Sequence, residues 1–134
     1  MTGKKIALLF VVVAGMSMSL SAQTRLSWSS LEACDTPSGR IEFTDEIEAL
    51  DNQLVRIKGF MIPLDTEGQE YALSAYPMSE CFFCGNAGPS SMLELHLVNP
   101  KRYSLDAYKS FTGRLTLSPA SQGLVFTLLD AEED

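Results

Sequence analysis

Alternating apolar and polar side chains predict a long β-strand in segment 54–64. An apolar residue at every second position is typical of a strand that buries one face. The apolar positions change parity after Gly59, which predicts a bulge or a sharp coil there, because glycine tolerates the backbone geometry of such a distortion. The apolar side chains of this segment are Val55 and Ile57 before the glycine, and Phe60, Ile62 and Leu64 after it.

Four more segments have the same two-residue period. Residues 71–78 are expected to form the second strand, which Pro77 ends or places at a sheet edge. The third strand, over residues 92–98, has Leu93, Leu95 and Leu97 on one face and Met92, Glu94, His96 and Val98 on the other. The last two strands are expected to turn Phe111, Leu115 and Leu117, and then Leu124, Phe126 and Leu128, toward the core.

Short helices are expected at three places. Two lie before the first strand, at residues 28–33 and 45–50, and in the second of these Asp45 is expected to cap the helix while Glu48 reaches back. The third follows Ser104, which can cap a turn that runs to Tyr108. The resulting order predicts a mostly β fold: a small OB-like five-stranded barrel with a short helix between strands 3 and 4 and short N-terminal helical turns. A small open sandwich is the alternative.

Residues 1–22 have the pattern of a secretory signal peptide. Lys4 and Lys5 precede an apolar run, and small residues lead to a preferred cleavage site after Ala22. The run is short for a retained membrane anchor, which is the alternative, so no membrane span is expected after cleavage. Residues 23–134 are then expected to form a single OB-like β domain in a periplasmic or secreted protein of the bacterial envelope.

The charge of the chain argues against two classes of partner. The formal net charge is −7, and removal of Lys4 and Lys5 makes it −9. Nucleic acids and anionic lipid surfaces are bound through basic patches, so an acidic domain is not expected to bind them. The acidic end of the chain, residues 130–134, is expected to be a solvated tail.

The signatures of common enzymes are missing from the sequence. There is a single histidine, His96, and it stands within a predicted strand with no serine marked as its partner. There is also no nucleophile elbow, no phosphate-binding glycine loop and no zinc-protease helix motif. We therefore expect a protein that is not an enzyme, with thiol-redox activity as the remaining possibility.

The most informative stretch is the Cys-x-x-Cys-Gly sequence at residues 81–85. Two thiolates at this spacing, followed by a glycine, resemble half of a zinc knuckle. The chain has one more cysteine, Cys34, and one imidazole, so a metal set of Cys81, Cys84, His96 and Cys34 would use every soft ligand after the signal segment. Zinc or copper(I) is the expected ion, and a carboxylate such as Glu80 or Glu94 could instead complete the shell.

Two other interpretations of the same cysteines remain open. Exported chains meet an oxidising compartment, so Cys81 and Cys84 could form a structural disulfide in an interaction module, or Cys34 could pair with either. Thiol–disulfide exchange is the second alternative. It is disfavoured because reactive pairs usually stand at a helix N-terminus, whereas residues 85–89 have a loop composition.

Two stretches of the chain resemble a known family of exported bacterial proteins. They are FTDEIEALDNQLVRIKGFMIPLD, at residues 43–65, and YALSAYPMSECFFCGNAGPSSMLEL, at residues 71–95, and they are preceded by WSSL at residues 28–31. Together they are similar to the domain of unknown function 3299 family, in which such a strand precedes a cysteine-bearing loop. The resemblance covers most of the domain and implies no firm activity.

The resemblance supports some of the candidate residues and leaves others without support. Cys81 is the residue that best matches the cysteine of the family's loop. Many members have a single cysteine followed closely by a histidine and several prolines, whereas this chain has Cys84 and then residues 85–89, as in a branch with a Cys-x-x-Cys loop. Relatives encoded beside metal-responsive transporters imply an envelope transporter or another protein as partner. We therefore expect a non-enzymatic accessory or binding protein that handles metal through this loop.

Overall fold

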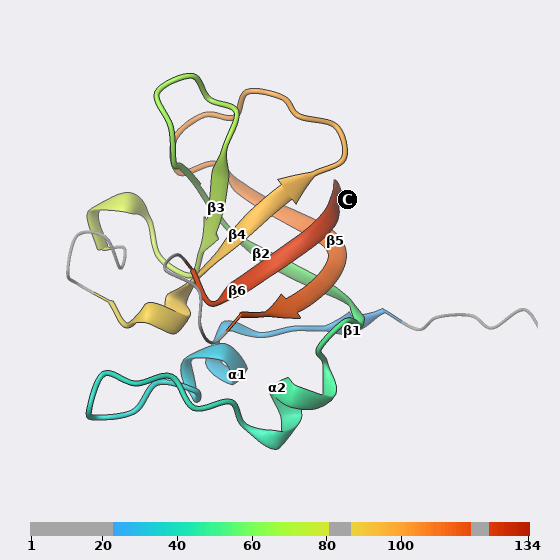
Figure 1. Ribbon diagram of the computed structural model, residues 1–134. Helices are drawn as coiled ribbons and strands as arrows, with labels where there is room; N and C mark the ends of the chain where they lie inside the picture. Colours follow the sequence, from blue (N-terminus) through green and yellow to red (C-terminus); the bar gives the residue numbers. More distant parts are fainter. Residues whose placement is uncertain (1–22, 81–86, 119–123) are drawn as a thin grey trace, which may run out of the picture.

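The chain forms a closed five-stranded barrel with one additional strand (Figure 1). The computed structural model describes residues 23–80, 87–118 and 124–134. The barrel strands are β2 (Leu54–Pro63), β3 (Tyr71–Ser74), β4 (Met92–Leu97), β5 (Tyr108–Leu117) and β6 (Phe126–Glu133). They are hydrogen-bonded in the order β2-β3-β4-β6-β5, and β5 pairs with β2 to close the ring. The predicted OB-like barrel is confirmed, and the open sandwich is wrong.

The pairing directions follow the OB pattern. The β4–β6 pair is parallel, and the other barrel pairs are antiparallel. The additional strand, β1 (Thr24–Arg25), runs parallel to β2 and extends the sheet beyond it. The inward positions predicted for β4 and β5 are confirmed, because Leu93, Leu95, Phe111 and Leu115 are all buried in the main core.

β2 is the strand on which the barrel closes, and Gly59 lies at the point where its partners change. Residues 54–60 of β2 pair with β5, and residues 60–63 pair with β3 on the opposite edge. A Cβ atom at Gly59 would lie 2.6 Å from the carbonyl oxygen of Ser74 and 3.0 Å from the Trp28 ring. The indole of Trp28 also donates a 2.6 Å hydrogen bond to the Lys58 carbonyl, between the stretches of β2 that pair with β1 and β3. Glycine is therefore required at residue 59 because the neighbouring chain leaves no room for a side chain.

The predicted change of parity at Gly59 is wrong. Val55, Ile57, Gly59 and Met61 all face the main core, and neither ladder of β2 contains a bulge. The prediction failed because apolar residues also lie on the outer face of β2, where Ile62 is buried in a second, smaller cluster. That cluster consists of Ile62, Ala72 and Met92, with Met78 and Leu124 packed against it.

Two short helices lie together at one end of the barrel (Figure 1). They are α1 (Trp28–Glu32) and α2 (Asp45–Ala49), and both were predicted. The cap of α2 was assigned one residue too late, because the Thr44 hydroxyl accepts from the Ile47 N–H at 3.3 Å. A threonine oxygen satisfies this free N–H as an aspartate would.

The helix expected between the third and fourth predicted strands, which are β4 and β5 in the structure, is absent, because residues 98–107 contain no helix. The end of this segment instead joins β2: the Met61 N–H donates to the Ala107 carbonyl at 2.8 Å, and the Asp106 N–H donates to the Met61 carbonyl at 3.1 Å. Asp106 also has a φ of 58°, which interrupts a right-handed helix. Tertiary hydrogen bonds thus outweigh the local helix signal at Ser104.

The acidic end of the chain is part of the barrel, so the expectation of a solvated tail is wrong. β6 continues to Glu133 through a β-bulge in which Gly113 of β5 stands opposite both Asp130 and Ala131. Asp130 has a φ of 50°, as the first residue of such a bulge often does. The Asp134 carboxylate then accepts hydrogen bonds from Arg56, Ser110 and Thr112.

Within the ranges described, no helix has the length and apolar character needed to cross a membrane.

Replacing Gly59 by alanine is expected to destabilise the protein by about 1–3 kcal/mol, because the new methyl group overlaps backbone and ring atoms that cannot move independently. The free energy of unfolding in urea measures the effect. Gly39→Ala is the control: a Cβ there meets no atom within 4 Å, and only its φ of 78° opposes the change. The packing argument fails if the two variants lose the same stability.

Candidate functional site

The segment with the two neighbouring cysteines leaves the barrel between β3 and β4. Two 3₁₀ turns, η1 (Met78–Glu80) and η3 (Pro89–Ser91), stand on either side of it. Cys81 and Cys84 lie outside the described residues, so the metal, disulfide and exchange interpretations of this pair still rest on the sequence. The described residues do show how both ends of the segment are held.

The first end of the segment is held to α1 and to the turn before β5. The Tyr76 hydroxyl donates to the Glu32 carboxylate, and this hydrogen bond is the main reason that the pKa of Tyr76 is raised above its usual value of 10.0. Two residues later, the Met78 N–H donates to the Asp106 carboxylate at 2.8 Å. The chain therefore enters the cysteine segment from a fixed position.

The second end is held by Asp35, which follows α1. Its carboxylate accepts from the Ser90 N–H at 3.2 Å. The carboxylate also lies so close to Gly88 that a side chain there would have to displace it, which favours glycine at that position. The Ser91 hydroxyl adds a 2.6 Å hydrogen bond to the Gly88 carbonyl. Both ends of the cysteine segment thus meet the same short region, residues 32–35.

Ser90 has an unusual environment. It is fully buried, and its hydroxyl is the one buried side-chain polar atom in the described chain that has no hydrogen-bond partner. A buried hydroxyl without a partner is costly, and most such groups in native proteins are satisfied by protein or water. Ser90 therefore offers one unused polar group at the base of the cysteine segment.

Cys34 lies next to Asp35 but belongs to the main core. Its side chain is completely buried, and its Sγ approaches the Ser30 carbonyl at 3.9 Å. It forms no disulfide in the structure. A cysteine in such surroundings behaves as a small apolar residue, and a thiolate there would need a compensating charge.

The structure places His96 away from the cysteine segment. β4 begins at Met92, directly after η3, and His96 is four residues further along, a distance of about 13 Å for an extended strand. The imidazole is about half exposed and is hydrogen-bonded to Glu94 at 2.9 Å. Cys34 and His96 therefore lie toward opposite ends of the barrel. In the described ranges, no three His, Cys, Asp or Glu side chains are grouped as a metal site would require.

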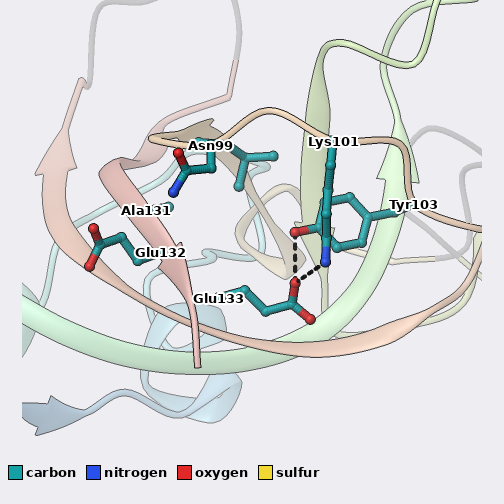
Figure 2. Close-up of a pocket in the computed structure, with 7 residues that line it drawn as sticks. Asn99, Lys101, Tyr103, Ala131, Glu132 and Glu133 are labelled. Carbon is teal, nitrogen blue, oxygen red and sulfur yellow. Dashed lines mark hydrogen bonds and ion pairs between the residues drawn. The ribbon is translucent and has the colours of Figure 1, made fainter.

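A second polar cluster, which the sequence did not predict, lies at the other end of the barrel (Figure 2). The Glu133 carboxylate is contacted by Lys101 at 2.8 Å, by the Tyr103 hydroxyl at 3.0 Å and by Lys109 at 3.3 Å. The cluster borders a cavity of about 320 Å³ that Leu97 and the Asn99 side chain also line. Its members come from the 98–107 segment, β5 and β6, so no short sequence motif could predict the cluster.

The members of this cluster shift the pKa values of Glu133 and Tyr103. The hydrogen bond from Lys101 is the main reason that the pKa of Glu133 is lowered, since it outweighs the opposing effect of partial burial. Burial and the hydrogen bond to Glu133 raise the pKa of Tyr103 to about 12. The ring of Tyr103 packs edge-on against Tyr71 and Phe111, so it covers the core while its hydroxyl reaches the carboxylate. These contacts suit a structural closure of the barrel.

The comparisons with known proteins show a shared fold. No protein-family model matches the sequence, and no curated protein matches it. Among solved structures, a domain of unknown function 3299 (DUF3299) family protein from Pseudomonas aeruginosa has a TM-score of 0.57 at 14% identity. The match covers 84% of this chain and 97% of the neighbour. The structural neighbour therefore comes from the uncharacterised family that the sequence motifs resemble, and the shared barrel fold agrees with that resemblance.

Replacing Asp35 by alanine is expected to lower the free energy of unfolding by about 1–3 kcal/mol, because it leaves the buried Ser90 N–H without an acceptor. Asp35→Asn keeps an acceptor oxygen and should lose less. Urea unfolding of both variants measures the difference. Equal stability of the alanine variant and the unmodified protein would show that Asp35 does not hold the segment.

Glu133 is expected to make stability depend on pH in the acid range. Because its folded pKa is lowered, its contribution is fully present above its ordinary pKa of 4.5 and is lost as the pH falls through the folded value. Glu133→Gln should therefore flatten the stability curve as the pH falls below about 4.5, as measured by urea unfolding at each pH. Glu132→Gln, an exposed neighbour with no ion pair in the described ranges, is the control and should leave the slope unchanged.

Proposed function

We propose that this chain is an exported member of the DUF3299 family that acts as a non-enzymatic accessory protein in the cell envelope. In this proposal, the thiolates of Cys81 and Cys84 capture zinc or copper(I), and a carboxylate or a partner protein supplies the remaining ligands. Thiolates favour these soft or borderline ions over magnesium and calcium. An envelope transporter or another envelope protein is the proposed recipient or source of the ion.

One observation carries the proposal: both ends of the cysteine segment are fixed to residues 32–35. The Ser90–Asp35 hydrogen bond holds the chain after the two cysteines, and before them the Tyr76 hydroxyl lies beside the Glu32 carboxylate. A loop with fixed ends loses less conformational entropy when it orders around an ion, so this arrangement favours binding.

The described residues near the segment fit an ion that accepts sulfur and oxygen. Glu80 directly precedes Cys81, and the carboxylates of Glu32 and Asp35 lie at the base of the segment. Zinc accepts carboxylate oxygen beside thiolate sulfur, and a site with an open position can take a ligand from a partner. Of the four ligands considered from the sequence, Cys34 lies within the core and His96 lies along β4, so neither is part of the proposed set.

The single imidazole supports the proposal of a non-enzymatic role. His96 is hydrogen-bonded to Glu94, and no serine hydroxyl contacts its ring among the residues that the structure describes. A general base must lie within hydrogen-bond reach of the group it activates. Among the described residues, His96 therefore has no serine partner of the kind that a hydrolytic triad needs.

The burial of Cys34 also favours one alternative. Because Cys34 is enclosed in the core without a disulfide, Cys81 and Cys84 are left as each other's nearest partners in sequence. In an oxidising compartment these two could form a stapling disulfide or an exchange-active pair instead of binding metal.

The mature chain, prepared from an exported source without added metal, should retain about one equivalent of zinc or copper with both loop thiols protected. Thiol titration and elemental analysis on the same sample test this. A sample without metal whose peptide map shows a Cys81–Cys84 linkage would contradict the metal proposal and support the disulfide.

Cys81→Ser and Cys84→Ser are each expected to abolish the bound metal while the barrel stays folded, because in this proposal both thiolates are ligands and serine is close to cysteine in size. The measurements are metal content and far-ultraviolet circular dichroism. Cys34→Ala is the matched control: it removes a buried side chain, so it should lower stability by about 1 kcal/mol and leave the metal content unchanged. Loss of metal in the control as well would assign Cys34 to the site.

A further inference from the structure

The outer surface of β1, β2 and β5 carries an unusual share of the positive charge. Eight of the ten lysine and arginine residues remain after Lys4 and Lys5 are set aside. Five of these eight lie on the three strands, and Lys109 among them contacts Glu133 in the cluster at the barrel end. The other four alternate with the buried positions of their strands and lie on the outer side: Arg25, Arg56, Lys58 and Arg114. We call this surface the basic face.

Two of these cations already bind carboxylates of the chain itself. Arg56 pairs with Asp134 at 2.9 Å, and the same carboxylate accepts hydrogen bonds from Ser110 and Thr112. Arg114 approaches Asp130 at 4.0 Å. The acidic end of the chain therefore lies along this face, with a carboxylate bonded to residues of β2 and β5.

The other two cations of the basic face are available. Arg25 and Lys58 are exposed, and neither forms an ion pair in the described chain. Arg25 is the ladder partner of Arg56, and Lys58 is two residues beyond Arg56 on the same side of β2. The two unpaired cations are therefore both neighbours of Arg56, the cation that is paired with Asp134.

An aromatic pair ends the basic face. Phe60 and Tyr108 are ladder partners on β2 and β5, and their rings meet edge to face at 5.0 Å. Tyr108 is 59% exposed, and Leu105 in the preceding turn is 55% exposed. An exposed tyrosine that packs on a partly buried phenylalanine, beside unpaired cations, is suited to a surface that binds another molecule.

We propose that the basic face binds an acidic, extended polypeptide segment of a partner protein. Carboxylates of the segment pair with Arg25 and Lys58, and one apolar side chain of the segment packs on the Phe60–Tyr108 pair. The chain's own end is the precedent for this arrangement, because an extended acidic strand already places Asp134 on Arg56. From Arg56 to Phe60 is about 13 Å along β2, so about five extended residues of the partner cover this length.

A polypeptide fits this face better than a membrane or a nucleic acid. Those two present extended negative charge, which the net charge of −9 carried by residues 23–134 repels (−7 less the two lysines). A short segment interacts mainly with charges within about 10 Å. The unpaired cations Arg25 and Lys58 lie on the β1–β2 side of the face, whereas the exposed Glu132 lies beyond β5, on β6. The inference does not depend on metal binding at the cysteine segment.

The test uses a fluorescent peptide of about eight residues that alternates glutamate with valine and phenylalanine. Fluorescence anisotropy should show saturable binding to the mature chain, weakened by added salt. A peptide with lysine in place of each glutamate should not bind. Absence of binding by the glutamate peptide, or equal binding of both peptides, overturns the proposal.

Charge reversal locates the interaction. Lys58→Glu and Arg25→Glu are each expected to weaken binding about tenfold, because each replaces an attraction by a repulsion. Tyr108→Ala should weaken binding of the glutamate peptide and leave its salt dependence unchanged. Arg40→Glu is the matched control, since Arg40 is exposed and lies in the loop between the two helices. A loss of affinity in the control equal to that of Lys58→Glu overturns the assignment to this face.

Lipid vesicles distinguish the other class of partner. Vesicles of phosphatidylcholine containing phosphatidylserine should not bind the chain, in contrast to the glutamate peptide. If the vesicles bind, the peptide does not, and Lys58→Glu abolishes the vesicle binding, then the basic face is a membrane surface and the proposed polypeptide partner is wrong. Metal content of the Lys58→Glu variant should equal that of the unmodified chain, which separates this inference from the thiol proposal.

Discussion

The close approach of β2 to β3 at Gly59 is the constraint on which the rest of the structure depends. One strand must pair with β5 over its first half and with β3 over its second, and the barrel closes only if it does both. At the changeover, the space that a side chain would take is filled by the Ser74 carbonyl and the Trp28 ring. The helix α1 is thereby attached to the strand that organises the barrel.

This attachment determines what each end of the barrel can do. At one end, α1 continues into residues 32–35, which hold both sides of the cysteine segment through Tyr76 and Ser90. At the other end, Tyr103 covers the core and Glu133 joins two lysines across the rim. The polar groups at this second end are largely bonded to one another, whereas the first end retains an unsatisfied Ser90 hydroxyl. The difference explains why we place the proposed ion at the cysteine end.

The alternation of side chains predicted the strands and the OB-like order well, because one inward face per strand is a local property. It failed where a second surface also matters. Ile62 looked like an inward residue, but it is buried in the outer cluster, so the parity of β2 never changes. Ser104 looked like a helix cap, but the following residues are hydrogen-bonded to Met61 of β2. The acidic residues after Leu129 looked like a solvated tail, but a bulge opposite Gly113 keeps them in the ladder.

The same distinction applies to function. A Cys-x-x-Cys spacing is local and was visible in the sequence, whereas the hydrogen bond between Asp35 and Ser90 joins residues 55 positions apart. The basic face likewise depends on the register of β1, β2 and β5, which brings Arg25 beside Arg56 and Phe60 beside Tyr108. β2 carries part of the basic face and also pairs with β3, the strand that leads into the cysteine segment. A partner bound to the face would therefore contact the strand that pairs with β3. The two surfaces therefore share one rigid element while using different side chains, which allows each to be altered without the other.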